Sequence, residues 1–218
     1  MKFLTLYALL GLMFSVEACD GQDQKSVSTT TFKESLSEKE LARLDTATLA
    51  GGCFWCVEAS LEQIKGVYEV VSGYAGGAEK NPTYTAVSRG STGHTETVQV
   101  YYDPDVRNYK EILKIFFTAH DPTQLNRQGP DVGKQYRSAI FFHDAKQKKV
   151  IEEVIYELES NNAYDKPIVT EVQPLDRFWM AEEYHQDYAR RNPNDGYIQA
   201  ISIPKVKKVR KAFPELIK

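Results

Sequence analysis

The stretch TATLAGGCFWCVEASLEQI at residues 46–64 joins a predicted strand to a predicted helix through a double glycine. Its beginning suits a strand, which Gly51 and Gly52 interrupt. Apolar residues then recur at helical spacing, so we expect a helix to begin close to Cys53. These apolar residues are Val57, Leu61 and Ile64. Two cysteines, Cys53 and Cys56, therefore lie at a strand-to-helix turn.

A thiol at the start of a helix is well placed for nucleophilic chemistry. Unpaired N–H groups and the positive end of the helix dipole stabilise a thiolate there. We expect Cys53 to be the nucleophile and Cys56 to form a disulfide with it across one helical turn. The two glycines allow a sharp turn that keeps the thiol accessible. Phe54 and Trp55 would surround the thiol as an apolar cup for a small apolar group.

Other interpretations of the two cysteines remain open at this point. A zinc site would need two more ligands, but the domain has no further cysteine and its four histidines form no paired ligand motif. The pair could also be buried structural cysteines, with Phe54 and Trp55 as core residues. The flanking glycines and the predicted helix start favour a reactive thiol over both alternatives.

Strand alternation points to a buried carboxyl group. In the predicted strand 95–102, Glu96 shares one face with Val98, Val100 and Tyr102. The opposite face carries polar residues, so we expect the face of Glu96 to be the buried one. Burial would raise the pKa of this carboxyl and keep it protonated near neutral pH, as a general acid requires.

Composition indicates a globular protein with one folded domain and a tail. Of the 218 residues, 42% are hydrophobic and 26% charged, and the net charge of −3 provides no basic field for nucleic acid. Strands and helices intermix irregularly, which predicts an α+β domain with a mixed sheet and helices packed against it. We expect further strands at 67–72, 136–142 and 168–172, helices at 109–117, 144–158 and 178–191, and loops at 73–82 and 120–134.

The N-terminus is typical of an exported protein. Residues 1–18 contain one lysine and a short apolar run, which predicts an export signal rather than a membrane-spanning helix. Cys19 follows a small residue, as in bacterial lipoproteins, so we expect a lipid anchor there, with a plain cleaved signal as the alternative. Residues 19–40 are polar, and this composition predicts that they form a tether. The domain would then span 41–218, outside the cytosol, in the periplasm or attached to a membrane.

Several long motifs occur in order from about Leu49 to the C-terminus, and together they resemble the A-type peptide methionine sulfoxide reductases, which act on the S epimer. These motifs are GCFWCVE at 52–58, VSGYAGG at 71–77, NPTY at 81–84, GHTETV at 93–98, HDPTQLNRQG at 120–129, QYRSAI at 135–140 and AEEYHQDY at 181–188. The resemblance implies that family's two-layer sandwich fold and the reduction of methionine sulfoxide, free or in proteins.

The resemblance also implies roles for single residues. It makes Cys53 the nucleophile and Glu96 the acid, and it makes Phe54 and Trp55 the walls that receive the substrate methyl group. In the same way, Tyr84 and Tyr136 would bind the sulfoxide oxygen, and Asp131 would help to fix the substrate backbone. His94, His120, Asp121 and His185 are expected to support the fold. The basic run at 205–211 is expected to be a solvated helix face.

Many members of the family have glycine at the position of Cys56 and a recycling cysteine near the C-terminus. The C-terminal segment here has none, so Cys56 is the candidate resolving residue. A thioredoxin-like protein or a dithiol would reduce the Cys53–Cys56 disulfide, with no bound cofactor and no metal. We expect a monomer that binds no nucleic acid. The alternative functions are a general thiol–disulfide oxidoreductase and a module that binds methionine peptides.

Overall fold

The turn between β1 (Asp45–Gly51) and α3 (Phe54–Glu62) depends on Gly52. The computed structural model describes residues 42–218. In it Gly52 has a φ of +89°, and a Cβ atom at this position would lie 2.5 Å from Cβ of Gln128. Only glycine has both the backbone freedom and the small size that this turn requires. The turn makes Cys53 the N-cap residue of α3.

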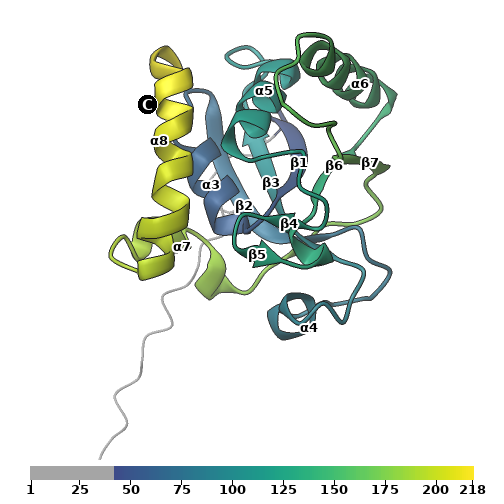
Figure 1. Cartoon of the computed structure of the whole chain (residues 1–218), viewed down its shortest axis with the longest axis vertical. Helices are drawn as coiled ribbons and strands as arrows, with labels where there is room; N and C mark the ends of the chain where they lie inside the picture. The colour runs from purple at the N-terminus through teal and green to yellow at the C-terminus, as the bar shows by residue number, and fades with distance from the viewer. Residues whose placement is uncertain (1–41) are drawn as a thin grey trace, which may run out of the picture.

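Six strands form one mixed sheet in the order β7-β6-β1-β3-β2-β8 (Figure 1). All neighbours are antiparallel except β6 and β7, which run parallel. The remaining strands of this sheet are β2 (Val67–Ala75), β3 (Thr95–Tyr102), β6 (Ser138–Phe142), β7 (Glu171–Pro174) and β8 (Trp179–Met180). The short strands β4 (Arg127–Gln128) and β5 (Asp131–Val132) form a separate antiparallel pair.

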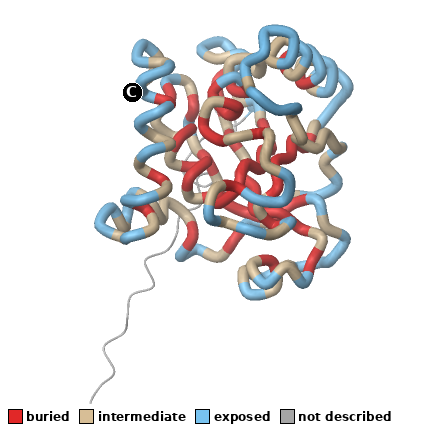
Figure 2. The backbone as a smooth tube through the Cα atoms, in the orientation of Figure 1, coloured by how far each residue is buried: buried red, intermediate tan, exposed pale blue. Residues whose placement is uncertain are grey.

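Helices α3 and α5 lie beside one another and pack against the sheet, and α8 packs on both of them. The buried residues in Figure 2 concentrate where these helices meet the strands. The other helices are α4 (Tyr84–Ser88), α5 (Tyr109–Ala119), α6 (Ala145–Ser160), α7 (Tyr188–Arg191) and α8 (Ile203–Ala212), which follows a π-helical turn at Ile198–Ser202. α5 begins with a capping box formed by Asn108 and Glu111.

The predicted α+β class is confirmed, and so is the mixed sheet with helices packed on it. The alternating strand at 95–102 has the predicted bounds. The helices predicted at 109–117 and 144–158 also exist, with small differences at their ends, and Asp144 caps the second by accepting a hydrogen bond from the Gln147 amide.

The predicted helix at 178–191 is wrong. Its first part forms β8, which pairs with β2, and only Tyr188–Arg191 is α-helical. Asp187 has a φ of 55°, in the left-handed region, which prevents a continuous helix through this segment. The turn residues between β8 and α7 instead bring side chains toward α3.

The loop predicted at 73–82 begins later than expected, because β2 continues to Ala75. A Cβ atom at Gly73 would lie 2.4 Å from the carbonyl oxygen of Trp179. Gly73 therefore allows β8 to approach β2 closely, rather than marking a turn.

The predicted export signal at 1–18 and tether at 19–40 lie outside the described residues. Across residues 42–218, no helix is both long enough and apolar enough to pass through a membrane.

Candidate functional site

The centre of the site is a hydrogen bond between the start of α3 and the start of β3. The backbone N–H of Phe54, directly after Cys53, donates to Oε2 of Glu96 over 3.0 Å. The first N–H groups of a helix have no partner within the helix, so this carboxyl satisfies one of them. Glu96 is therefore fixed next to the residue that carries the first thiol.

Glu96 is only 2% exposed, and burial raises its pKa to about 8. The hydrogen bond from Phe54 opposes this rise, while the nearby charge of Asp131 adds to it. The strand alternation thus gave the correct face for Glu96. The polar residues Thr95 and Thr97 on the other face are buried as well. Their hydroxyls are satisfied by hydrogen bonds, since Thr95 donates to the carbonyl of Gln135 and Thr97 donates to the carbonyl of Thr95.

The thiol of Cys53 is 5% exposed, and burial raises its pKa well above the ordinary value. Its interaction with Cys56 and the negative charge of Glu96 act in the same direction. The expectation of an accessible thiolate at the helix start is wrong for this state. The cause is the tertiary structure, since the sulfur is removed from water and the N–H of Phe54 already binds Glu96.

Cys56 lies in the first turn of α3 and is also buried and reduced. Its Sγ atom is 4.0 Å from the hydroxyl of Tyr197. The pKa of Cys56 is lowered, first by its interaction with the Cys53 thiol and then by Lys205, Tyr197 and Ser202, against the effect of burial. Of the two thiols, Cys56 is therefore the one that ionises more readily.

Aromatic rings surround the first turn of α3. Phe54 is 1% exposed, and its ring centroid lies 5.9 Å from that of Trp55 and 6.4 Å from that of Tyr84. Trp55 is partly exposed and stacks on Tyr188 with 3.9 Å between the centroids. The rings of this cluster pack around the first turn of α3, and the role of Phe54 and Trp55 in receiving a small apolar group stays a prediction.

Tyr84 and Tyr136 come from α4 and from the turn before β6, and both are partly buried. Burial, followed by the negative charge of Glu96, raises the pKa of Tyr84 to about 12 and also raises that of Tyr136. Both therefore keep their hydroxyl protons at neutral pH and can donate hydrogen bonds. Glu182 fixes α4 by accepting from the backbone N–H of Tyr84 over 2.9 Å.

Asp131 reaches the site from β5, and its Oδ2 atom accepts a 2.6 Å hydrogen bond from the Tyr197 hydroxyl. The same hydroxyl faces Cys56, so Tyr197 connects the second thiol to Asp131. Sequence reasoning did not select Tyr197, because nothing in the surrounding Asn-Asp-Gly-Tyr segment distinguishes it from the other tyrosines.

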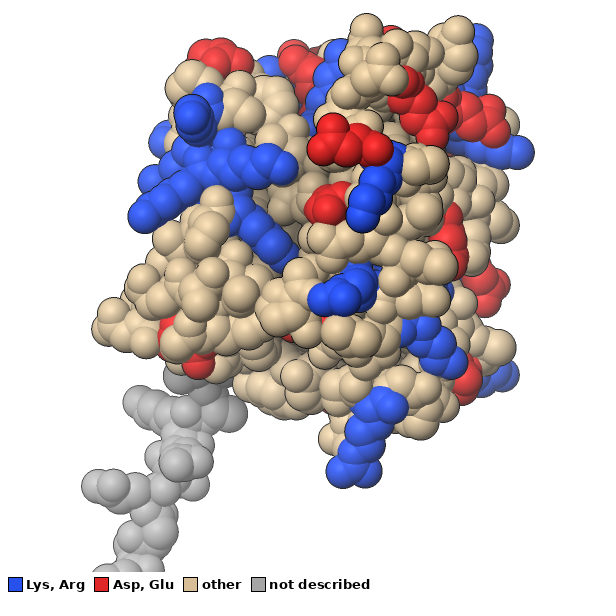
Figure 3. Space-filling model, viewed as in Figure 1, with Lys and Arg blue, Asp and Glu red and all other residues tan. Residues whose placement is uncertain are grey.

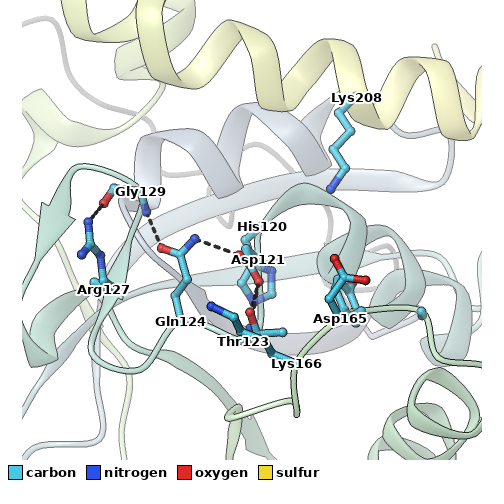
Figure 4. Close-up of a pocket in the computed structure, with 11 residues that line it drawn as sticks. His120, Asp121, Thr123, Gln124, Arg127, Gly129, Asp165, Lys166 and Lys208 are labelled. Carbon is cyan, nitrogen blue, oxygen red and sulfur yellow. Dashed lines mark hydrogen bonds between the residues drawn. The ribbon is translucent and has the colours of Figure 1, made fainter.

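The loop before β5 is held by its own polar side chains. Gln128 donates to the carbonyl of Asp121 and accepts from the N–H of the same residue, and Gln124 accepts from the N–H of Gly129. Figure 4 shows part of this network beside a hollow that extends toward Lys208. The hollow is lined by none of the predicted catalytic or substrate-binding residues. The network fixes the loop that carries Asp131 and places Gln128 against Gly52.

His185 belongs to the aromatic cluster, although we expected it only to support the fold. Its ring centroid lies 4.3 Å from that of Tyr84 and 5.0 Å from that of Phe54. Both ring nitrogens are buried, and neither has a hydrogen-bond partner within residues 42–218. Burial lowers the pKa of His185 to about 4, so the ring is neutral. Its position inside the AEEYHQDY motif was the one available signal.

His120 and Glu58 are also buried, and their hydrogen bonds support the fold. His120 interacts through Nδ1 with the carbonyl of Phe116 and through Nε2 with the hydroxyl of Ser138. Glu58 accepts hydrogen bonds from the Ser72 hydroxyl and from the Asp187 N–H. In the described part of the chain, no three His, Cys, Asp or Glu side chains are grouped so as to hold a metal ion.

Comparison with known proteins gives a consistent result. Residues 45–217 match the family model described as peptide methionine sulfoxide reductase. The peptide methionine sulfoxide reductase MsrA of Natronomonas pharaonis is 54% identical over 172 residues, which is 79% of this chain and 97% of that protein. The MsrA of Haloquadratum walsbyi is 56% identical over 171 residues, which is 78% of this chain and 97% of that protein.

The fold is also found in solved structures. Mxr1 from Saccharomyces cerevisiae in its reduced form matches with a TM-score of 0.66 and 36% identity. The match covers 71% of this chain and 88% of that chain. The similarity therefore extends over most of the part of the chain that the structure describes.

The burial of Glu96 predicts a specific dependence of stability on pH. The pKa of this group is about 8 in the folded protein and near its ordinary value of 4.5 in the unfolded chain, so the folded state binds more protons between these pH values. Stability is lost as pH rises through this interval. Glu96→Gln keeps the acceptor for the Phe54 N–H. We expect its free energy of unfolding to be about 3 kcal/mol higher than that of the parent protein at neutral pH.

Urea denaturation of both proteins at mildly acidic and neutral pH measures this difference. Below pH 4.5 the two proteins should have similar free energies of unfolding, because the carboxyl is neutral in both states. A difference that does not change with pH would contradict the assignment of a raised pKa to Glu96.

Proposed function

The chain belongs to the peptide methionine sulfoxide reductase family and is therefore an oxidoreductase that reduces methionine sulfoxide, and we propose that Cys53 carries out this reduction on the S epimer. The observation that supports this assignment most strongly is the hydrogen bond from the N–H of Phe54 to the buried Glu96. It places a carboxyl that is protonated at neutral pH beside a buried thiol.

In the proposed complex, the methyl group of the substrate lies against Phe54 and Trp55. The apolar character and the close spacing of the aromatic rings support this orientation, because a methyl group gains from leaving water while a charged group would lose. Asp131 would accept a hydrogen bond from the substrate backbone. Its position beside Tyr197 leaves it at the edge of the same cluster.

The chemical step is a transfer of oxygen from methionine sulfoxide to the Cys53 sulfur. Cys53 attacks the sulfoxide sulfur while Glu96 donates a proton to the sulfoxide oxygen. The hydroxyls of Tyr84 and Tyr136 donate hydrogen bonds to this oxygen as charge develops on it. The proton of the Cys53 thiol returns to Glu96, methionine leaves, and Cys53 remains as a sulfenic acid.

Recycling would use the second thiol. Cys56 attacks the sulfur of the Cys53 sulfenic acid, an S–S bond forms, the S–O bond breaks and water leaves. A thioredoxin-like protein or a small dithiol then reduces the disulfide by thiol exchange. The Cys-x-x-Cys spacing at the start of α3 supports this route, because it places both sulfurs in one helical turn. No cofactor bound to the chain takes part in these steps.

A general thiol–disulfide oxidoreductase would be the alternative. That activity requires two thiols but neither a protonated carboxyl nor an aromatic cluster. The burial of Glu96 at 2% exposure beside Cys53 favours sulfoxide reduction, since a carboxyl in this position would otherwise destabilise the fold without a benefit.

The test of the proposed function is Glu96→Gln. We expect this variant to reduce methionine S-sulfoxide ~10²-fold more slowly, because the general acid is lost. The measurement follows methionine formed from each sulfoxide epimer with dithiothreitol as reductant. Glu58→Gln is the matched control, since Glu58 is also buried with a raised pKa but accepts its hydrogen bonds from Ser72 and Asp187 and not from the start of α3. Unchanged turnover in Glu96→Gln would favour the general oxidoreductase.

Cys56→Ser tests the recycling route. Without a second thiol, the sulfenic acid at Cys53 has no partner in the domain with which to form a disulfide. We expect one equivalent of methionine per protein in the first turnover and little further product with a thioredoxin system. Continued cycling at the parent rate would mean that the reductant attacks the sulfenic acid directly.

We further propose that the protein acts as an exported monomer, in the periplasm or attached to a membrane by lipid at Cys19. The apolar run at the N-terminus and the cysteine after a small residue support this location. Outside the cytosol a Cys-x-x-Cys pair tends to stay oxidised, so its reduction would need a partner that receives electrons across the membrane. The mass of the mature N-terminus tests the lipid attachment.

A further inference from the structure

Lys205 differs from the other basic residues of α8. Figure 3 shows Lys and Arg side chains gathered on the surface over this helix, and four of them are exposed. These are Lys207, Lys208, Arg210 and Lys211. In contrast, Nζ of Lys205 is enclosed and has no hydrogen-bond partner among residues 42–218. The expectation that the whole run 205–211 is a solvated face is therefore wrong for its first residue.

The spacing of the sequence explains why Lys205 points inward. Ser202, Lys205 and Val209 follow one another at intervals of three and four residues and so share one face of the helix. Ser202 and Val209 are both buried. This face packs against α3 and α5, so the long side chain of Lys205 enters the space between the helices.

The hydroxyl of Ser202 is also enclosed without a hydrogen-bond partner in the described residues. An ammonium and a hydroxyl that are both buried and unpaired are costly, unless an anion forms beside them during function. Cys56, in the first turn of α3, is an acidic group close to Lys205 and Ser202, and after its interaction with the Cys53 thiol both of them lower its pKa.

Other groups around this space do not provide the missing negative charge. Glu62 of α3 lines a hollow together with Ser202, and burial raises the pKa of this carboxyl to about 8, so it is mostly protonated at neutral pH. His120, at the end of α5, is neutral because burial lowers its pKa to about 4, and the charge of Lys205 adds to that effect. The hydroxyl of Tyr197 donates to Asp131. Cys53 and Glu96 both have raised pKa values, so they remain mostly protonated at neutral pH.

We propose that Lys205 and Ser202 hold the Cys56 sulfur as a thiolate, which makes Cys56 the attacking group when Cys53 becomes a sulfenic acid. This inference rests on the proposed function, since it assigns a role in the recycling half of that reaction. Lys205 is a positioning residue here, because it acts through Cys56 and does not contact the substrate.

The Cys56 thiolate attacks the sulfur of the Cys53 sulfenic acid, forming the S–S bond as the S–O bond breaks. The departing hydroxide takes a proton from the carboxyl of Glu96 and leaves as water. Glu96 regains a proton when the disulfide is later reduced. The negative charge beside Lys205 disappears in this step, so the ammonium is paired before the attack and unpaired after it.

The direct test is the ionisation of Cys56 in a Cys53→Ser background, where it is the single thiol of the domain. Ultraviolet absorbance of the thiolate is followed during a pH titration. We expect Lys205→Met to raise the midpoint by about one pH unit, which is a ~10-fold lower thiolate fraction below the midpoint. Lys205→Arg keeps the charge and should retain most of the effect.

Lys207→Met is the matched control, because it removes an exposed charge from the same helix. Equal midpoints for Lys205→Met and Lys207→Met would overturn the proposal. Ser202→Ala provides a second variant if Lys205→Met does not fold. It should raise the midpoint by a smaller amount, and an unchanged midpoint in Ser202→Ala would then overturn the proposal.

A kinetic experiment connects the ionisation to the reaction. The protein with both thiols receives one equivalent of methionine sulfoxide, and acid quenching with mass analysis follows methionine release and disulfide formation separately. In Lys205→Met the rate constant for disulfide formation, relative to that for methionine release, should fall ~10-fold at neutral pH and recover at higher pH. An unchanged ratio would contradict the role of Lys205. Failure of the proposed function would instead appear as no methionine from the parent protein, while the titration would still report on Lys205.

Discussion

The hydrogen bond between the Phe54 N–H and Glu96 is the constraint on which the site depends. It joins the first free donor of α3 to a carboxyl on β3, and it fixes that carboxyl beside Cys53. Gly52 makes the bond possible, because its backbone conformation directs the chain from β1 into the helix while Gln128 lies against it. The sheet and the helix are thus connected by a buried polar contact.

The same burial that suits Glu96 to donate a proton also opposes ionisation of Cys53. A low dielectric disfavours every charged form, so the acid and the nucleophile are both protonated before substrate arrives. Cys56 is the exception, because its interaction with the Cys53 thiol lowers its pKa, and Lys205, Tyr197 and Ser202 lower it further. The two sulfurs therefore differ in ionisation although they are three residues apart, and this difference matches their proposed order of use.

Much of the fold could be predicted from local patterns. The alternation in β3 identified its bounds and the face of Glu96, and helical spacing identified α5 and α6. The helix predicted at 178–191 was wrong, because the pairing of β8 with β2 and the left-handed conformation of Asp187 prevent a helix there. Pairing between distant strands depends on contacts that a single sequence does not show.

The site was less predictable where side chains meet across long distances in the chain. Tyr197 and Asp131 are 66 residues apart, and their hydrogen bond has no local signature. The burial of His185 depends on how β8 turns toward α3, and that of Lys205 depends on how α8 packs. The raised pKa of Cys53 likewise follows from the tertiary structure, since the helix start alone favours a thiolate.

Infrared difference spectroscopy of the parent protein and Glu96→Gln during a pH titration tests the central claim most directly. The carboxyl C=O stretch that is absent from the variant reports the protonation of Glu96 alone. If Glu96 is the proton donor, this signal persists at neutral pH and disappears with a midpoint near its pKa of about 8. A signal already lost near pH 4.5, the ordinary value for glutamate, would show that the carboxyl is ionised beside Cys53 and would contradict its role as the proton donor.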